Sequence, residues 1–131
     1  MKTIKVVAAV VIEDEKILCV QRGPSKYDYI SEKWEFPGGK VEEGETPEEG
    51  LVREIEEELH TTITDLNFLI QVDHTYPNFR IIMDTYTCKI EKGSITLTEH
   101  IAFDWEEVSN LDRFDWAAAD LPIVRKIKDT L

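Results

Sequence analysis

Residues 37–59, PGGKVEEGETPEEGLVREIEEEL, decide how the chain folds, because they join a sharp turn to its strongest helix signal. Thr46 is a good N-cap residue, Pro47 suits the first helical position, and Glu49 completes a capping box with Thr46. The pattern therefore predicts a helix over residues 46–59. The same stretch holds nine glutamates, and their like charges repel each other when they are crowded together.

The predicted helix carries three glutamates on one flank. Glu54, Glu57 and Glu58 are spaced i, i+3, i+4, which brings their side chains together on the helix surface beside Arg53. No lysine occurs in residues 41–88 to relieve the repulsion. The spacing alone leaves two interpretations open: a solvated acidic helix, or a flank that binds a cation.

The chemistry of carboxylates indicates which cation would fit. Carboxylate oxygens are hard ligands that suit Mg²⁺ or Mn²⁺ better than zinc. Mg²⁺ held by carboxylates usually keeps several water molecules and bridges to the phosphate groups of a substrate. If the flank binds a cation, the residues therefore indicate metal-assisted phosphate chemistry.

Length and composition restrict the class of protein. The 131 residues, 42% hydrophobic and 32% charged, are typical of a globular protein, and we expect a single domain over residues 1–131. The formal net charge of −12 argues against a duplex nucleic acid partner, which needs a basic face. No apolar run is long enough to span a membrane, so we expect no membrane partner. The short N-terminal apolar run alternates into charges and favours a strand over a signal peptide.

Cys19 and Cys88 are the only cysteines, and neither has the spacing of a metal site or a redox motif. Both lie in apolar, strand-like segments. We therefore expect free thiols in the core of a protein from a reducing compartment, which predicts a cytoplasmic location.

The rest of the chain is rich in strand signals and ends in a second helix. The helix is predicted over residues 119–131, where Asp120 could act as its cap. A mixed sheet with helices packed against it fits this order of elements, which places the chain in the α/β class. The predicted strands lie in residues 4–14, 16–22, 34–39, 66–76, 80–90, 94–98 and 100–108.

The acidic stretch resembles the Nudix hydrolase box, G-x5-E-x7-R-E-U-x-E-E-x-G-U, where U is a bulky aliphatic residue. Two positions depart from it: His60 replaces a glycine and Thr61 replaces an aliphatic residue. The box glycine would end the helix with a left-handed residue, and histidine can adopt that conformation at a modest cost. We therefore interpret His60 as a helix-end substitution, and a functional histidine is the alternative. Seven fixed positions match, which makes the likeness highly specific: Gly39, Glu45, Arg53, Glu54, Ile55, Glu57 and Glu58.

The resemblance extends over nearly the whole chain. The chain is similar to the MutT-type branch of the family. It implies an α/β/α sandwich with a mixed central β-sheet, in which the box forms a loop-helix-loop. It also implies Mg²⁺-dependent hydrolysis of (deoxy)nucleoside triphosphates to a nucleoside monophosphate and pyrophosphate, with Mn²⁺ as a substitute metal. Some members of this branch remove oxidised guanine nucleotides, and others prefer CTP-like substrates.

The resemblance also implies a set of metal ligands. By position, Glu54, Glu57 and Glu58 bind the metal, together with the carbonyl of Gly38 and with Glu99. The residue that takes the proton from the attacking water is either Glu54 or Glu99. The alternative for Glu99 is an ordinary exposed glutamate.

Other residues receive supporting roles. Arg53, counted with the catalytic residues, is expected to orient the glutamates through charge-assisted hydrogen bonds. Glu45 is expected to brace the loop that Gly39 begins. Arg22 and Lys40 are candidates for phosphate contact, and simple exposure to solvent is their alternative.

Three residues are candidates for contact with the nucleotide base. Asp120 matches the place of a base-binding side chain in MutT-type enzymes, and an ionised aspartate accepts hydrogen bonds from an amino group such as that of cytosine or adenine. Phe79 could stack on a base or pack in the core. Trp34 is either a pocket residue or a core residue.

Two other functions remain open. The same fold and metal could serve ADP-ribose or another nucleoside diphosphate derivative. A non-catalytic module that senses nucleotides is the third reading, although such modules typically lose box glutamates and this chain keeps them. The sequence predicts either a monomer or a homodimer.

Overall fold

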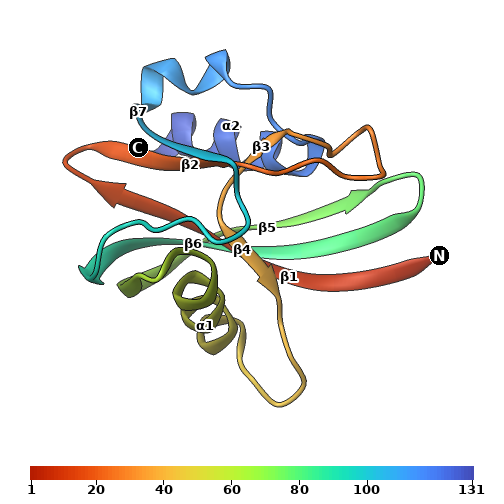
Figure 1. Ribbon diagram of the computed structural model, residues 1–131, viewed down its shortest axis with the longest axis horizontal. Coiled ribbons are helices and arrows are strands. Elements are labelled where there is room, and N and C mark those ends of the chain that lie inside the picture. Colours follow the sequence, from red (N-terminus) through yellow and green to blue (C-terminus); the bar gives the residue numbers. More distant parts are fainter.

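The computed structural model describes residues 1–131 and has one helix on each face of a mixed sheet (Figure 1). This arrangement confirms the predicted α/β/α sandwich. The elements are β1 (Lys2–Glu13), β2 (Lys16–Gln21), β3 (Trp34–Glu35), β4 (Gly38–Lys40), α1 (Pro47–Leu59), β5 (Thr62–Thr75), β6 (Phe79–Lys92), β7 (Ala102–Glu107), the 3₁₀ helices η1 (Val108–Arg113) and η2 (Ala118–Asp120), and α2 (Leu121–Thr130).

The sheet is organised around the long strand β1. This strand runs parallel to β6, and β5 follows β6 as an antiparallel neighbour. On its other side β1 pairs with β4 through residues 6–8 and then with β2 through residues 12–13. The strand β2 also pairs with β3 and β7. β1 therefore belongs to two parts of the sheet, one with β4, β5 and β6 and the other with β2, β3 and β7. The connection between β3 and β4 runs from the second part to the first.

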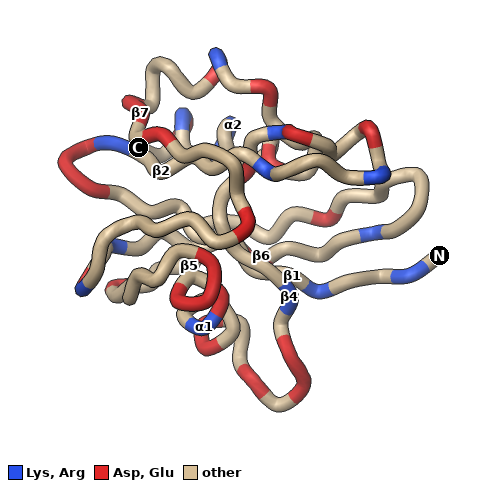
Figure 2. The backbone as a smooth tube through the Cα atoms, viewed as in Figure 1, with Lys and Arg blue, Asp and Glu red and all other residues tan.

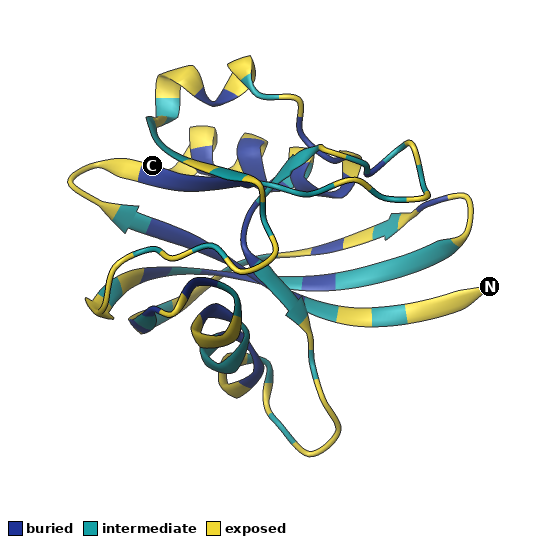
Figure 3. Cartoon of the chain, in the orientation of Figure 1, coloured by how far each residue is buried: buried dark blue, intermediate teal, exposed yellow.

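Alternate residues of β1 face opposite helices. Val7, Ala9 and Val11 pack with the apolar side of α1, whereas Ala8 and Val10 pack with the apolar side of α2. All five are almost completely buried. A strand that is covered on both faces has a continuous apolar sequence, which explains the run at residues 6–12. Figure 3 shows the buried residues along the middle of the sheet and on the inner sides of both helices.

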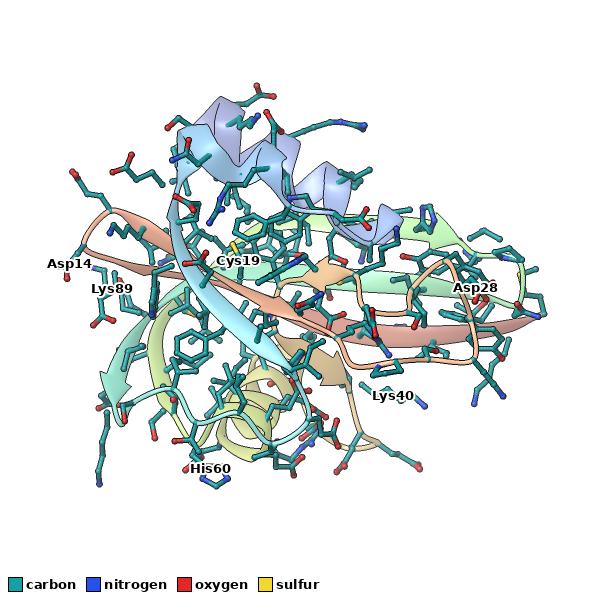
Figure 4. The ribbon with its side chains drawn as sticks, turned by 45° about the horizontal axis from the view of Figure 1, so that its top comes forward. Asp14, Cys19, Asp28, Lys40, His60 and Lys89 are labelled. Atoms are coloured by element: carbon teal, nitrogen blue, oxygen red, sulfur yellow. The ribbon has the colours of Figure 1, made fainter.

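Both ends of α1 have the predicted capping residues. Thr46 Oγ1 accepts a hydrogen bond from the Glu49 N–H at 3.1 Å, and the Glu49 carboxylate accepts one from the Thr46 N–H at 2.8 Å. At the other end His60 has φ 52° and ψ 39°, and its N–H donates to the carbonyl of Glu56. His60 therefore adopts the left-handed conformation expected of the box glycine, with its side chain exposed at the end of α1 (Figure 4).

The strand predicted over residues 94–98 is wrong, because this segment covers the C-terminal end of α1 instead (Figure 1). The Thr96 N–H donates to the carbonyl of Leu59 at 3.0 Å. The N–H and hydroxyl of Thr98 donate to the carbonyl of Glu58 at 3.2 and 3.0 Å. The last carbonyls of a helix have no partner inside the helix. The segment supplies these partners and forms no sheet ladder.

Cys19 and Cys88 are free, buried thiols on opposite faces of the sheet, as predicted. Burial raises the pKa of each thiol to about 12, so both are unreactive core residues. Figure 4 shows Cys19 inside the fold. Neither helix of the protein is long and apolar enough to cross a membrane.

Candidate active site

A cleft of about 600 Å³ lies where β1, the connection between β3 and β4, and the segment ahead of α2 meet. It brings together residues from distant parts of the sequence, and most of the predicted site residues line it. Those residues are Arg22, Gly38, Gly39, Lys40, Glu58, Phe79, Glu99 and Asp120.

Arg53 is the centre of a hydrogen-bond network beside the cleft. Its Nε and Nη2 donate to the two carboxylate oxygens of Glu45 at 3.0 and 2.7 Å. Its Nη1 donates to Glu54 at 3.0 Å and to Glu57 at 3.2 Å, and Nη2 also donates to the carbonyl of Lys40. The hydrogen bonds from Arg53 lower the pKa of Glu45 to about 2. This geometry fits the roles predicted for Arg53 and Glu45.

The two glycines of the turn are needed because other atoms approach their main chain closely. A Cβ atom on Gly39 would lie 2.4 Å from Cδ of Glu54, and a Cβ atom on Gly38 would lie 1.9 Å from the carbonyl oxygen of Val7. Both distances are shorter than a van der Waals contact. Gly38 therefore lets β4 pair with β1, and Gly39 lets the Glu54 carboxylate lie against the turn.

Glu58 is a largely buried carboxylate with an unpaired oxygen. Its side chain is 14% exposed, and Oε2 has no hydrogen-bond partner. Burial, followed by the neighbouring carboxylates of Glu54, Glu35 and Glu99, raises the pKa of Glu58 well above its ordinary value. A bound cation would favour the charged form of such a group. The unpaired oxygen and the surrounding carboxylates therefore fit a divalent cation, to which the main-chain carbonyl of Gly38 is also available.

The protein side chains do not form a complete metal cage by themselves. No group of three or more acidic, histidine or cysteine side chains is close enough to hold an ion. Glu57 is 60% exposed and pairs with Arg53. It lines a separate shallow groove between α1 and the start of β5. Figure 2 shows acidic residues along α1 and the loop before it. Such a site suits Mg²⁺, which usually completes its coordination with water and substrate oxygens.

Glu35 and His100 line the cleft and were missed in the sequence predictions. His100 Nε2 lies 2.9 Å from Glu35 Oε2, and His100 Nδ1 lies 3.9 Å from Glu58 Oε2. Glu35 also accepts a hydrogen bond from Nη1 of Arg22 at 3.3 Å. Strand alternation is the signal that could have revealed Glu35, since Trp34 packs in the core and the next residue of a strand faces the other side.

Asp120 is not the side-chain cap of α2 that the sequence suggested. Its backbone is already helical, with φ −89° and ψ −16°, whereas a capping side chain needs an extended backbone. Its Oδ1 instead accepts a hydrogen bond from the Phe36 N–H at 3.0 Å. Burial, and then the charge of Glu35, raise the pKa of Asp120 well above its ordinary value. A protonated Asp120 can both donate and accept hydrogen bonds in the cleft.

Aromatic residues form another part of the cleft. Phe79 lies beside Tyr76, with ring centroids 5.3 Å apart, and both line the cleft. The Tyr76 hydroxyl accepts a hydrogen bond from the Ala119 N–H at 3.0 Å. Tyr76 was missed because nothing in its sequence surroundings marks it. Trp34 does not line the cleft, and its ring packs against Phe114 with a centroid distance of 4.5 Å.

Acidic side chains outnumber basic ones around the cleft. The acidic residues there are Glu35, Glu58, Glu99 and Asp120, whereas Arg22 and Lys40 are the only lysine or arginine residues. Where these carboxyl groups are ionised, an anionic ligand is repelled by part of its own site unless cations enter with it.

The chain belongs to the Nudix family, because the NUDIX domain family model matches residues 2–127. Within that family it is 34% identical to the CTP pyrophosphohydrolase of Escherichia coli (strain K12), over 95% of this chain and 90% of that protein. It is 31% identical to the putative 8-oxo-dGTP diphosphatase 2 of Mycobacterium tuberculosis (strain H37Rv), over 96% and 89% of the two chains. These likenesses confirm the family predicted from the acidic box.

Solved structures support the same assignment. The MutT protein of methicillin-resistant Staphylococcus aureus 252, described as a Nudix hydrolase, is 41% identical, with a TM-score of 0.75 over 98% of both chains. A MutT Nudix hydrolase from Burkholderia pseudomallei is 24% identical and has a TM-score of 0.87 over 97% of this chain and 99% of that one, which shows a shared fold.

Proposed function

We propose that the protein hydrolyses (deoxy)nucleoside triphosphates to a nucleoside monophosphate and pyrophosphate, with Mg²⁺ as the required cation and Mn²⁺ as a substitute. The observation that carries this proposal is the buried Glu58 oxygen without a partner, surrounded by other carboxylates in the cleft. The relatives named CTP pyrophosphohydrolase and 8-oxo-dGTP diphosphatase support the same class of substrate.

Groups inside the box and two outside it, Gly38 and Glu99, are proposed to bind the metal and accept the proton. When bound, Mg²⁺ would shield the charge of the triphosphate and make a water molecule more acidic. Glu54 or Glu99 takes the proton from the attacking water, and Arg53 keeps Glu54 and Glu57 in place through its hydrogen bonds. The groups proposed to hold the metal are the side chains of Glu54, Glu57, Glu58 and Glu99 and the carbonyl of Gly38.

The basic residues of the cleft are proposed to bind the phosphates. Arg22 and Lys40 both line the cleft and carry its only permanent positive charges. Arg22 is also oriented by its hydrogen bond to Glu35. Glu45 contributes indirectly, because it holds the loop that follows Lys40 through Arg53.

Asp120 and Phe79 are proposed to select the base. A protonated Asp120 can donate to a ring nitrogen and accept from an exocyclic amino group, which is the pattern of cytosine and of adenine. Phe79 lines the cleft and is proposed to stack on the base. The relative named CTP pyrophosphohydrolase makes CTP or dCTP the first candidate. The relative named putative 8-oxo-dGTP diphosphatase makes an oxidised guanine nucleotide the second candidate.

A substrate screen tests the proposal directly. The purified protein with Mg²⁺ is given the common and damaged (d)NTPs and ADP-ribose, and the products are separated by ion-exchange chromatography. We expect a nucleoside monophosphate and pyrophosphate from one or more triphosphates. Cleavage of ADP-ribose alone would support the diphosphate-derivative alternative, and binding without cleavage would support the sensing module.

We also propose where the protein acts and in which oligomeric state. A cytoplasmic location fits a nucleotide substrate and two free, buried thiols. The protein is proposed to act as a monomer or a homodimer, which sedimentation of the purified chain would distinguish.

A further inference from the structure

We propose that His100 is a positioning residue for nucleotide binding: it fixes the carboxylate of Glu35, which in turn fixes Arg22 at the cleft. The inference rests on the proposed function for the class of ligand, a nucleoside triphosphate. His100 lies outside the box, on the segment between β6 and β7.

The side chain of Glu35 is held at both oxygens. Its Oε2 lies 2.9 Å from Nε2 of His100, and its Oε1 accepts from Nη1 of Arg22 at 3.3 Å. The His100 side chain is only 6% exposed and that of Glu35 is 20% exposed. A carboxylate with one partner on each oxygen in such a site has little freedom to rotate.

The surroundings determine which nitrogen of His100 carries the proton. An ionised carboxylate paired with Arg22 can only accept hydrogen bonds, so Nε2 of His100 must be the donor to Glu35. The other nitrogen, Nδ1, lies 3.9 Å from Oε2 of Glu58, beyond hydrogen-bond distance, and has no partner. The one hydrogen bond of the imidazole therefore goes to Glu35, and His100 acts through that residue.

This bond controls one of the few positive charges in the cleft. Without His100, the Glu35 carboxylate can rotate, repel the incoming phosphates and release Arg22 from its present orientation. Arg22 is proposed to contact the phosphates in the ground state and in the transition state alike. Loss of an interaction that is equal in both states raises KM and leaves kcat nearly unchanged.

Two substitutions of His100 distinguish the role of Nε2 from that of Nδ1. In His100→Gln the amide nitrogen reaches the position of Nε2, whereas in His100→Asn the side chain reaches only the position of Nδ1. We expect His100→Gln to stay within about threefold of the wild-type KM, and His100→Asn to raise KM about tenfold, because a hydrogen bond to a charged group is lost. The kcat of both variants should stay within about threefold of the wild type. His60→Asn, at an exposed histidine, is the control and should match the wild type.

Measurements of ligand binding distinguish the positioning role of His100 from an effect on metal binding or on folding. A methylene-bridged triphosphate analogue should bind His100→Asn about tenfold more weakly, while Mn²⁺ binding, followed by electron paramagnetic resonance, stays within about twofold of the wild type. In a Glu35→Ala background, His100→Asn should add less than a further twofold effect, roughly the limit of additivity. Equal losses in both His100 variants, or a loss of Mn²⁺ affinity alone, would overturn the proposal.

The proton on His100 can be observed without any catalysis. Long-range ¹⁵N–¹H correlation spectra of the wild-type protein should show a protonated Nε2, and an unprotonated Nε2 would overturn the proposal. If no triphosphate is cleaved, the proposed function fails, while the spectra and the analogue binding still decide the role of His100.

Discussion

The guanidinium of Arg53 and the carboxylate of Glu45 form a two-point ion pair, with Nε to Oε2 at 3.0 Å and Nη2 to Oε1 at 2.7 Å. Glu45 Oε1 also accepts the N–H of Glu42 at 2.7 Å, so the pair ties α1 to the loop before it. A bidentate pair of this kind specifies geometry as well as energy. The acidic box is therefore held together by one arginine.

The ion pair predicts how stability depends on pH. The pKa of Glu45 is about 2 in the folded protein against an ordinary 4.5. Its contribution to the free energy of unfolding is therefore complete above pH 4.5 and is lost as the pH falls from 4.5 towards 2. Glu45→Gln should lower stability at pH 7, and its difference from the wild type should shrink across that window, as followed by urea denaturation. The stability of Glu43→Gln, at an exposed position, should depend on pH as that of the wild type does. The same pH dependence in Glu45→Gln as in the wild type would refute the prediction.

Glu57→Gln tests the proposed metal ligands. We expect turnover to fall by about two to four orders of magnitude, because a charged group needed for transition-state stabilisation is lost. The melting temperature should change little, since Glu57 is 60% exposed. Glu56→Gln, on the adjacent exposed position of α1, is the matched control. A normal rate in Glu57→Gln would show that the residue is not a ligand.

Asp120→Ala tests base selection. Alanine removes the donor and the acceptor that the protonated carboxyl group presents in the cleft, together with the acceptor of the Phe36 N–H. We expect the ratio of kcat/KM between the best and second-best base to change by about tenfold or more. The Mg²⁺ concentration needed for half-maximal rate should stay the same. Asp115→Ala, at an exposed residue, serves as the control. An unchanged ranking of substrates would restrict Asp120 to its structural bond with Phe36.

Gly39→Ala tests the close approach of Glu54 to the turn. The added Cβ would lie 2.4 Å from Cδ of Glu54, so the carboxylate has to move. Displacement of a catalytic group by about 1 Å can cost roughly a hundredfold in rate. We expect kcat to fall by about that factor, while the protein stays folded because the end of a flexible side chain gives way. Circular dichroism and steady-state kinetics check both parts, and an unchanged kcat would contradict the account.

The box was the most predictable part of the protein, because its signals are local. The capping box at Thr46 and the left-handed His60 follow from residues that lie within a turn of each other in the sequence. Thr61 also fits its aliphatic position, since it is buried and its hydroxyl donates to the carbonyl of Leu59 at 2.9 Å. Most of the strand content was predictable too. The exceptions are residues 94–98, which form no strand, residues 34–39, which hold parts of the two strands β3 and β4, and β5, which begins at Thr62, ahead of the predicted start at residue 66.

The cleft was less predictable, because its contacts join residues far apart in the chain. Glu35 meets His100 and Asp120 approaches Phe36 only after β3 has paired with β2 and the last helix has packed on the sheet. The segment at residues 94–98 alternates like a strand, but the open carbonyls at the end of α1 compete for its amides. Sequence periodicity carries no information on that competition.

The cap that Thr96 and Thr98 place on α1 has a consequence for engineering. It joins the two proposed metal-binding regions through main-chain bonds, so the separation of Glu58 and Glu99 is set by the backbone. An insertion between the exposed Gly93 and Ser94 lies ahead of the cap and leaves these bonds in place, so it is a suitable place to graft a longer loop. Extra residues between Thr98 and Glu99 would instead uncouple the two regions.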